Sequence, residues 1–212
     1  MNQTKGQVVT LGVTGASGAL LAQKALQLLA EDSRVTKIHL VVTETGQRLF
    51  AEELGIASGD LKQLPARLLG KSHSKIEVLP NKDVGASIAS GSYEVDSMLV
   101  VPCSMGCLSA IANGSCDDLV SRSADVALKE GRKLVLCIRD TPFSRIHLEN
   151  MMRAQAAGAV IMPAVPSFYH HPKTIDDLVT QYLCRVLAQI GLAQDQMYRW
   201  TGSHTGAKKA EA

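Results

Sequence analysis

Residues 8–21 constrain the fold of this chain more than any other stretch. A β-branched apolar run opens the stretch, a turn of small residues follows at 14–18, and the residues from Ala19 onward have helical periodicity. This order predicts a strand, a tight turn and a helix N-terminus, where unpaired N–H groups and the helix dipole favour an anion such as phosphate. The spacing Gly12-x-x-Gly15-x-x-Gly18 matches neither the dinucleotide-binding glycine pattern nor a Walker loop. A phosphate-binding loop and a purely structural turn are therefore equal alternatives for this stretch.

A second predicted strand ends in a similar loop. The apolar run at 97–101 predicts a buried strand, and the small, hydroxyl-bearing segment at 102–107 leads from it into a predicted helix at 108–112. Ligands of open parallel sheets bind beyond the carboxyl ends of the strands, so two such loops can share one ligand. Strands alternate with helices along the whole chain, which predicts an α/β fold with a doubly wound, mainly parallel sheet.

The length and composition fit one domain. With 212 residues, of which 46% are hydrophobic, the chain can bury one good core, and we expect a single domain over residues 1–200 and a flexible tail at 201–212. The net charge of +2 is too close to neutral to indicate nucleic acid or an anionic membrane as a partner, and no apolar run is long enough for a membrane span.

The cysteines and the N-terminus favour a cytoplasmic protein. Five cysteines make an odd number in mostly apolar settings, which is typical of reduced thiols rather than of disulfides. Cys103 and Cys107 lack a second Cys or His pair that would complete a zinc site, so we interpret them as packing residues and expect no metal. Polar residues and glycines interrupt the first apolar stretch, so a signal peptide is not expected.

Two further predicted strands end in polar residues. The strand at 37–43 ends in Thr43, at the point where dinucleotide folds place an acid for the ribose diol, and a hydroxyl there favours a mononucleotide. The buried strand at 133–138 is followed by Arg139 and Asp140, fixed by Pro142, where α/β enzymes usually carry out their chemistry. An ion pair between these two side chains is the structural alternative.

Three cations lie on predicted helices at positions that suit an anion. Arg122 and Lys129 are seven residues apart on the helix predicted at 119–130, so they lie within about 20° of each other on its surface. From spacing alone, a solvated helix face explains this pair better than a phosphate site does. Arg185 lies at the edge of the apolar stripe of the last predicted helix, where we expect it to meet an anionic ligand or a neighbouring subunit.

Six motifs together resemble those of a known family. They are Thr14-Gly-Ala-Ser-Gly18, Ala89-Ser-Gly-Ser92, Pro102-Cys-Ser104, Ala124-Asp-Val-Ala-Leu-Lys129, Pro142-Phe-Ser with His147-Leu148, and Gly158-Ala-Val-Ile-Met-Pro163 with Phe168-Tyr-His170. From about Val8 to Trp200 the chain resembles the UbiX/Pad1 flavin prenyltransferases, within the wider flavin-binding decarboxylase superfamily. The resemblance implies a flavodoxin-like or Rossmann-like three-layer α/β domain, FMN near subunit interfaces and assembly into a homododecamer.

The resemblance also implies the reaction. In the family, N5 of reduced FMN attacks the dimethylallyl carbon as phosphate leaves, and ring closure through flavin C6 gives prenylated FMN. The partners implied are therefore dimethylallyl phosphate as donor and a UbiD-type decarboxylase as recipient of the product, with no metal. The pyrophosphate stays open as a donor, because the same cations serve either.

Carried over position by position, the resemblance implies three groups of site residues. The FMN contacts are Gly15, Ala16, Ser17, Thr43, Ser104, Met105, Gly106, Cys107 and Arg139. The site of the prenyl phosphate is formed by Ser90, Arg122, Lys129, Tyr169 and Arg185. Catalytic roles fall to Ser17, Glu53 and Asp140.

One position departs from the family pattern. Asp140 stands where the family usually has Glu as the acid–base group, and it is shorter by one carbon–carbon bond, about 1.5 Å. Because a misplacement of about 1 Å can cost on the order of a hundredfold in rate, we expect slow turnover unless the backbone compensates or Glu53 shares the proton transfer.

A non-catalytic FMN-binding or delivery protein is therefore an alternative. A flavin-dependent decarboxylase of cysteinyl substrates is less favoured, because the Pro-x-Met-Asn-x-x-Met-Trp block of that branch is missing.

Overall fold

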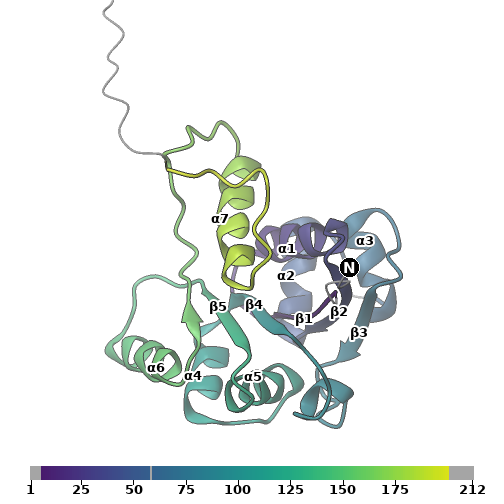
Figure 1. The fold of residues 1–212 in the computed structure, drawn as a ribbon, viewed down its shortest axis with the longest axis vertical. Coiled ribbons are helices and arrows are strands. Elements are labelled where there is room, and N and C mark those ends of the chain that lie inside the picture. Colours follow the sequence, from purple (N-terminus) through teal and green to yellow (C-terminus); the bar gives the residue numbers. More distant parts are fainter. Residues whose placement is uncertain (1–5, 58, 201–212) are drawn as a thin grey trace, which may run out of the picture.

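The computed structural model describes residues 6–57 and 59–200, and in it one parallel sheet forms the centre of the molecule (Figure 1). Its strands are β1 (Gln7–Val13), β2 (Val35–Val42), β3 (Ile76–Pro80), β4 (Ser97–Cys103), β5 (Lys133–Ile138) and β6 (Val160–Ile161). Their order across the sheet is β3-β2-β1-β4-β5-β6, and every neighbouring pair is parallel. The chain therefore starts in the middle of the sheet and builds outward to one side and then to the other, which confirms the predicted doubly wound fold. The predicted tail at 201–212 lies outside the described residues.

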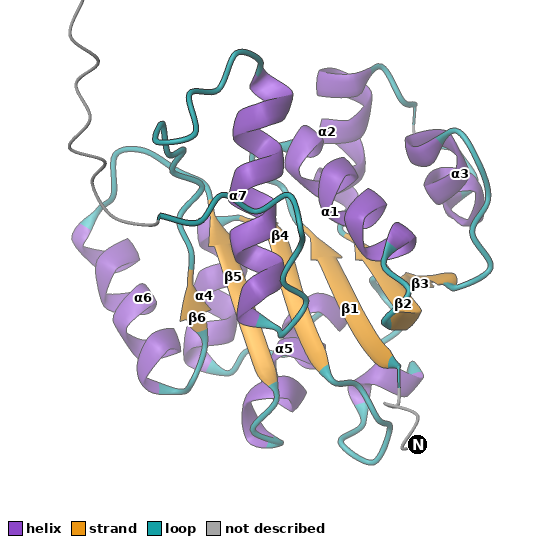
Figure 2. Ribbon diagram, turned by 45° about the horizontal axis from the view of Figure 1, so that its top comes forward, coloured by secondary structure: helices purple, strands orange, loops and turns teal. Residues whose placement is uncertain are grey.

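Helices cover both faces of the sheet and make three layers (Figure 2). They are α1 (Ala19–Glu31), α2 (Glu44–Leu54), α3 (Leu64–Leu69), α4 (Met105–Asn113), α5 (Leu119–Lys129), α6 (Arg145–Ala156) and α7 (Ile175–Gln189), with short 3-10 turns at η1 (Leu61–Gln63) and η2 (Ser87–Ala89). Helices α1, α2, α3 and α7 pack on one face, whereas α4, α5 and α6 pack on the other. Among the described residues, no helix is long and apolar enough to cross a bilayer.

The central strands are apolar at nearly every position because both of their faces are buried. Successive side chains of a strand point to opposite faces, so Leu99 and Val101 join the core under α1 and α7, and Val100 joins the core under α5. All three are fully buried. The packing on both faces fixes the strand tips, from which the polar loops project.

Some element boundaries differ from those predicted. Helix α4 begins at Met105 rather than near 108, because the Ser104 side chain accepts a hydrogen bond from the N–H of Cys107 and caps the helix three residues earlier. The last strand, β6, has only two residues. The segment after α2 contains α3 and leads into the edge strand β3.

The order of strands reverses beside β1, which lies between β2 and β4. The loop after β1 leads into α1 on one face, and the loop after β4 leads into α4 on the other. Loops that diverge in this way open a crevice at the carboxyl ends of the strands, which is the usual ligand position in open α/β sheets.

Candidate active site

The loops after β1 and β4 are joined by the buried side chain of Thr14. Its hydroxyl donates to the carbonyl oxygen of Pro102 over 2.8 Å and accepts from the N–H of Ser104, also over 2.8 Å. The N–H of Thr14 donates to the same Pro102 oxygen at 3.2 Å. The two loops predicted to share a ligand therefore lie side by side. The sequence pattern assigned no separate role to Thr14, although a hydroxyl at the end of a buried strand is a usable indication of one.

Glu53 of α2 caps the N-terminus of α1. The cap residue of α1 is Gly18, whose φ of 135° lies where L side chains are strained and which has no side chain to accept a bond. The Glu53 carboxylate instead accepts from the N–H groups of Ala19 at 2.7 Å and Gly18 at 3.0 Å. Two donors that the sequence suggested for an external anion are thus held by a carboxylate of the chain itself. The same bonds place Glu53 beside the loop that carries the exposed Ser17.

Arg139 and Asp140 follow β5 and do not pair with each other. The Arg139 Nε atom donates to the carbonyl oxygen of Ser17 over 2.9 Å, and its backbone N–H donates to Cys103. The Asp140 Oδ1 atom accepts from the N–H of Thr141 over 2.8 Å. Arg139 therefore ties the β5 loop to the loops after β1 and β4, and it brings a guanidinium to the same crevice.

Thr43 and Gly15 close the crevice on the side of β2. The Thr43 N–H donates to the carbonyl oxygen of Val13, and its hydroxyl caps α2 by accepting from Gly46 over 3.0 Å. A Cβ atom on Gly15 would come within 2.4 Å of the Thr45 Oγ1 atom, so only glycine allows the β1 loop this close to α2. Thr45 is thus a neighbour of the site that the sequence analysis did not find.

The first turn of α4 offers free space and donors. The capping Ser104 is followed by Met105, Gly106 and Cys107, and the first N–H groups of a helix have no partner within the helix. A Cβ atom on Gly106 would meet nothing within 4 Å, so the surface is open there. The residues predicted to contact FMN therefore come together from the ends of β1, β2, β4 and β5.

The cysteines next to this turn are chemically quiet. The Cys107 thiol beside it and its own burial raise the pKa of Cys103 well above its ordinary value, and burial raises the pKa of Cys137 to about 12. Both thiols therefore stay protonated at neutral pH, which supports a packing role. Within the described part of the chain, no group of His, Cys, Asp and Glu side chains is arranged to hold a metal ion.

Three of the predicted phosphate residues meet at η2 and α5. The Arg122 Nε atom donates to the carbonyl oxygen of Ala89 over 3.1 Å, next to Ser90. A Cβ atom on Gly91 would lie 2.7 Å from the Lys129 Nζ atom, so this lysine sits directly against the turn at 90–92. The two cations, about 10 Å apart along the helix axis, thus contact one loop, and each also pairs with a neighbouring acid on its own helix segment, Asp125 or Glu130.

The other two predicted phosphate residues, Tyr169 and Arg185, line a cavity of about 300 Å³ beside α7. Trp200 lines the same cavity, and its ring centroid lies 5.7 Å from that of Tyr169. The Tyr169 side chain is 67% exposed and therefore accessible to a ligand or to another subunit.

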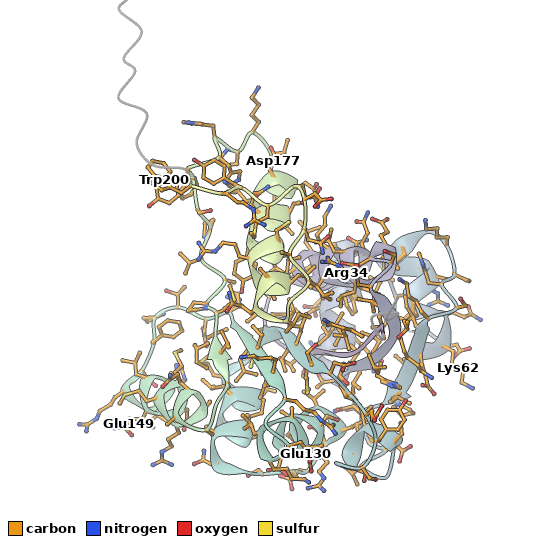
Figure 3. The ribbon with its side chains drawn as sticks, viewed as in Figure 1. Arg34, Lys62, Glu130, Glu149, Asp177 and Trp200 are labelled. Atoms are coloured by element: carbon orange, nitrogen blue, oxygen red, sulfur yellow. The ribbon has the colours of Figure 1, made fainter. Side chains whose placement is uncertain are left out.

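These two groups lie on opposite faces of the sheet, so the expected convergence of Arg122, Lys129 and Arg185 does not occur within one chain. Helix α5 belongs to one core and α7 to the other. Figure 3 shows Glu130, the neighbour of Lys129, and Trp200 at opposite ends of the molecule. Helical spacing indicates which residues share a helix face, but it does not determine which layer the helix joins.

Comparison with known proteins identifies the family of the chain. The model of the Flavoprotein family matches residues 1–186. The flavin prenyltransferase UbiX of Pseudomonas aeruginosa is 42% identical over 200 residues, which is 92% of this chain and 95% of that protein.

Two solved structures superpose closely on this chain. The crystal structure of AnUbiX (PadA1) with FMN and dimethylallyl pyrophosphate has a TM-score of 0.83 at 39% identity, over 93% of this chain and 99% of the other. The dodecameric FMN-dependent UbiX-like decarboxylase of Escherichia coli O157:H7 has a TM-score of 0.82 at 40% identity, over 92% of this chain and 100% of the other. The chain therefore belongs to the flavoprotein family and, within it, to the UbiX/Pad1 flavin prenyltransferases.

Proposed function

We propose that this protein is a cytoplasmic flavin prenyltransferase that moves the dimethylallyl group of dimethylallyl phosphate onto N5 and C6 of reduced FMN. The product is prenylated FMN, which a UbiD-type decarboxylase then uses. The observation that carries the proposal is the crevice at the strand tips, where Thr14, Arg139 and Glu53 hold three loops together, in a chain about 40% identical to flavin prenyltransferases.

The residues of the crevice fit FMN. A flavin mononucleotide offers a phosphate and a ring edge of carbonyl and nitrogen acceptors, so it needs several donors arranged around one crevice. The first-turn amides of α4, the hydroxyls of Ser104 and Thr43 and the Arg139 guanidinium are donors of this kind, at the ends of three different strands. When bound, reduced FMN supplies the nucleophilic N5 atom.

The donor site is completed by a second copy of the chain. Ser90, Arg122 and Lys129 form one half of an anion site, and Tyr169 and Arg185 form the other half on the opposite face. Only contact between two subunits brings such halves together. Large apolar side chains that are exposed on α6, among them Ile146 and Met152, suit a subunit interface. We propose a homododecamer, the assembly named for the Escherichia coli relative.

The protein contributes charge, position and proton transfer to the reaction. The carbon–oxygen bond of the donor breaks as the new carbon–nitrogen bond forms, so negative charge grows on the departing phosphate. Arg122, Lys129 and Arg185 stabilise that charge, and Ser90 orients the phosphate by its hydroxyl. Asp140 and Glu53, both at the crevice, exchange protons with the reacting groups, while Ser17 donates a hydrogen bond from the loop between them.

The direct test combines the purified protein, reduced FMN and dimethylallyl phosphate in the absence of oxygen. We expect an altered flavin absorption spectrum and a mass increase of one prenyl group on the flavin. Dimethylallyl pyrophosphate, the ligand named for the AnUbiX structure, is tested in parallel as the second donor. The comparison shows which of the two compounds the protein uses. A flavin that stays unchanged with both donors contradicts the proposal.

The alternative of a non-catalytic FMN-binding or delivery protein depends on Asp140. Its carboxylate bonds to the neighbouring backbone at Thr141, which holds it close to the chain. Asp140→Glu extends the carboxylate by about 1.5 Å, and for an enzyme we expect up to a hundredfold faster prenylation. FMN binding without prenylation in both forms would favour the delivery protein.

A further inference from the structure

A polar cluster built around the buried His39 lies behind the turn at 90–92. His39 of β2 is fully buried, and two residues later Val41 belongs to the core under α5, so His39 points to the same face of the sheet. Its Nε2 atom lies 3.0 Å from the Tyr93 hydroxyl, and the two rings meet edge to face with centroids 5.4 Å apart. On its other side, the Nδ1 atom lies 3.2 Å from a carboxylate oxygen of Glu77 on β3, within ion-pair distance but outside hydrogen-bond geometry.

The charges around His39 decide which way its hydrogen bond to Tyr93 runs. Lys37 pairs with Glu77 at 2.9 Å and, by its hydrogen bond, lowers the pKa of that carboxyl, so Glu77 is ionised. Burial lowers the pKa of His39, so at neutral pH the ring is uncharged and carries one proton. The negative charge of Glu77 favours the proton on the Nδ1 atom that faces it, and Nε2 then accepts the proton of the Tyr93 hydroxyl.

Tyr93 joins this cluster to the turn that carries Ser90. The N–H of Tyr93 donates to the carbonyl oxygen of Ser90 over 3.2 Å and closes the turn. Within the turn, the hydroxyls of Ser90 and Ser92 lie 2.9 Å apart. On its outer side Arg132 donates to the carbonyl oxygen of Gly91 over 2.6 Å. The turn is thus held between α5 and the Tyr93 side chain, and His39 is the buried anchor of that side chain.

We propose that His39 and Tyr93 are positioning residues for the anion site of Ser90, Arg122 and Lys129: the half-buried hydrogen bond between them fixes the turn that presents the Ser90 hydroxyl to the donor phosphate. This inference rests on the proposed function of that site. Neither residue touches the anion, so both act through the turn. The groups that face His39 are Glu77 and Lys37 from the sheet and Tyr93 from the loop before β4.

The test measures sulfate binding to the FMN-loaded, assembled protein by calorimetry. Sulfate has the shape of phosphate and keeps its charge over the pH range used. Tyr93→Phe removes only the hydroxyl, and we expect about tenfold weaker sulfate binding, the loss that corresponds to one hydrogen bond. Gln23→Met is the matched control, because it removes the side-chain bond from Gln23 to the Leu68 carbonyl oxygen on the other face of the sheet. Its sulfate affinity should stay unchanged.

Two variants of His39 separate positioning from simple packing. In His39→Gln an amide can accept from Tyr93 and donate toward Glu77 without titrating, so we expect sulfate affinity close to that of the unaltered protein. In His39→Leu the acceptor is gone, and we expect the loss seen in Tyr93→Phe. Protonation of His39 also removes the acceptor. Sulfate binding by the unaltered protein should therefore weaken when the pH falls below the ordinary range of histidine pKa values. Sulfate binding by His39→Gln should not weaken in this way.

The outcomes distinguish this inference from the proposed function. If the unaltered protein binds no sulfate, the anion site itself is wrong, and the positioning role fails with it. If sulfate binds and Ser90→Ala weakens it but Tyr93→Phe does not, the proposed site stands and the positioning role is overturned. Equal losses in His39→Gln and His39→Leu, with both variants folded by circular dichroism, overturn it as well.

Discussion

Ser104 donates its N–H to the Oγ1 atom of Thr14 over 2.8 Å, and that hydroxyl donates onward to the carbonyl oxygen of Pro102. One buried side chain thereby satisfies two backbone groups of the neighbouring strand end. Because β1 and β4 are adjacent in the sheet and their loops diverge, this side chain determines the width of the crevice between them.

Replacement of Thr14 by valine should loosen the crevice while the shape of the side chain is kept. The N–H of Ser104 would lose its acceptor, and the carbonyl oxygen of Pro102 would keep only the N–H of residue 14 as a donor, which together cost about 2 kcal/mol of the free energy of unfolding. We expect FMN to bind about tenfold more weakly, as measured by quenching of flavin fluorescence. Thr14→Ser is the control, since it keeps the hydroxyl and should keep FMN binding. Equal FMN affinity in Thr14→Val and the unaltered protein would contradict this account.

Glu53 has a structural and a proposed chemical role, and two substitutions separate them. Glu53→Gln retains a side-chain oxygen for the N–H groups of Gly18 and Ala19, so the cap of α1 should persist. Glu53→Ala removes the cap and should lower the free energy of unfolding by about 1 kcal/mol. Both variants lose proton transfer, for which we expect a reduction of about a hundredfold or more in the rate of prenylation.

The neighbouring Glu52 provides the matched control for these variants. It is exposed and pairs with Arg48 on the surface of α2, so Glu52→Gln changes the same charge outside the site. The prenylation rate of Glu52→Gln, and the urea concentration at which half of this variant is unfolded, should both stay near the values of the unaltered protein. A Glu53→Gln variant that is as active as Glu52→Gln would leave Glu53 with its capping role alone.

Asp32, at the end of α1, should make stability depend on pH. A side-chain hydrogen bond from Arg34 lowers the pKa of Asp32 from 3.8 to about 2, and Gln194 also donates to its carboxylate over 2.9 Å. A lowered folded-state pKa means that the carboxylate stabilises the fold above pH 3.8, and that this stabilisation disappears as the pH falls toward 2. Asp32→Asn should therefore lower the free energy of unfolding by about 1 kcal/mol at pH 7, a value reduced for solvent screening.

Urea unfolding at several pH values checks this expectation. The difference between Asp32→Asn and the unaltered protein should shrink as the pH falls through 3.8. Glu31→Gln, one residue earlier, is the control for loss of a charge at the same helix end. A difference that stays constant down to pH 2 would show that the Asp32 contribution is not electrostatic.

Local patterns predicted the fold because each strand and helix carries its own periodicity. The apolar runs at 97–101 and 133–138 were predicted as buried strands, and both are buried on two faces as β4 and β5. A helix was predicted at 119–130, and the Asp118 side chain caps that helix, α5, by accepting from the N–H of Ser121 over 2.8 Å. Cap residues and periodicity act over a few residues, so the sequence displays them directly.

Contacts between distant elements were less accessible to sequence reasoning. Glu53 caps a helix 34 residues away, and no local pattern in α2 predicts such a bond. The half-buried hydrogen bond between His39 and Tyr93 spans 54 residues and likewise appears only in the fold. The same limit applies to Arg122 and Arg185, because the layer that each helix joins depends on the order of strands in the sheet.

The proposed donor site needs two subunits, and mixed assemblies can test this directly. Arg122→Met disables one half of each site and Arg185→Met the other, so each variant alone should prenylate FMN at least a hundredfold more slowly than the unaltered protein. When the two variants are co-expressed in equal amounts, each half of a donor site comes from one variant or the other at random. About one quarter of the sites then contain both arginines, and we expect about a quarter of the unaltered activity.

The control for this experiment is a mixture in which both substitutions fall on the same half. Arg122 and Lys129 belong to one helix of one subunit, so co-expression of Arg122→Met with Lys129→Met never unites both cations in one site, and activity should stay as low as in the single variants. If activity recovers in the first mixture and not in the control mixture, α5 of one copy and α7 of another must face the same donor. Equal recovery in both mixtures, or in neither, would mean that the two cation groups do not share a site across the interface.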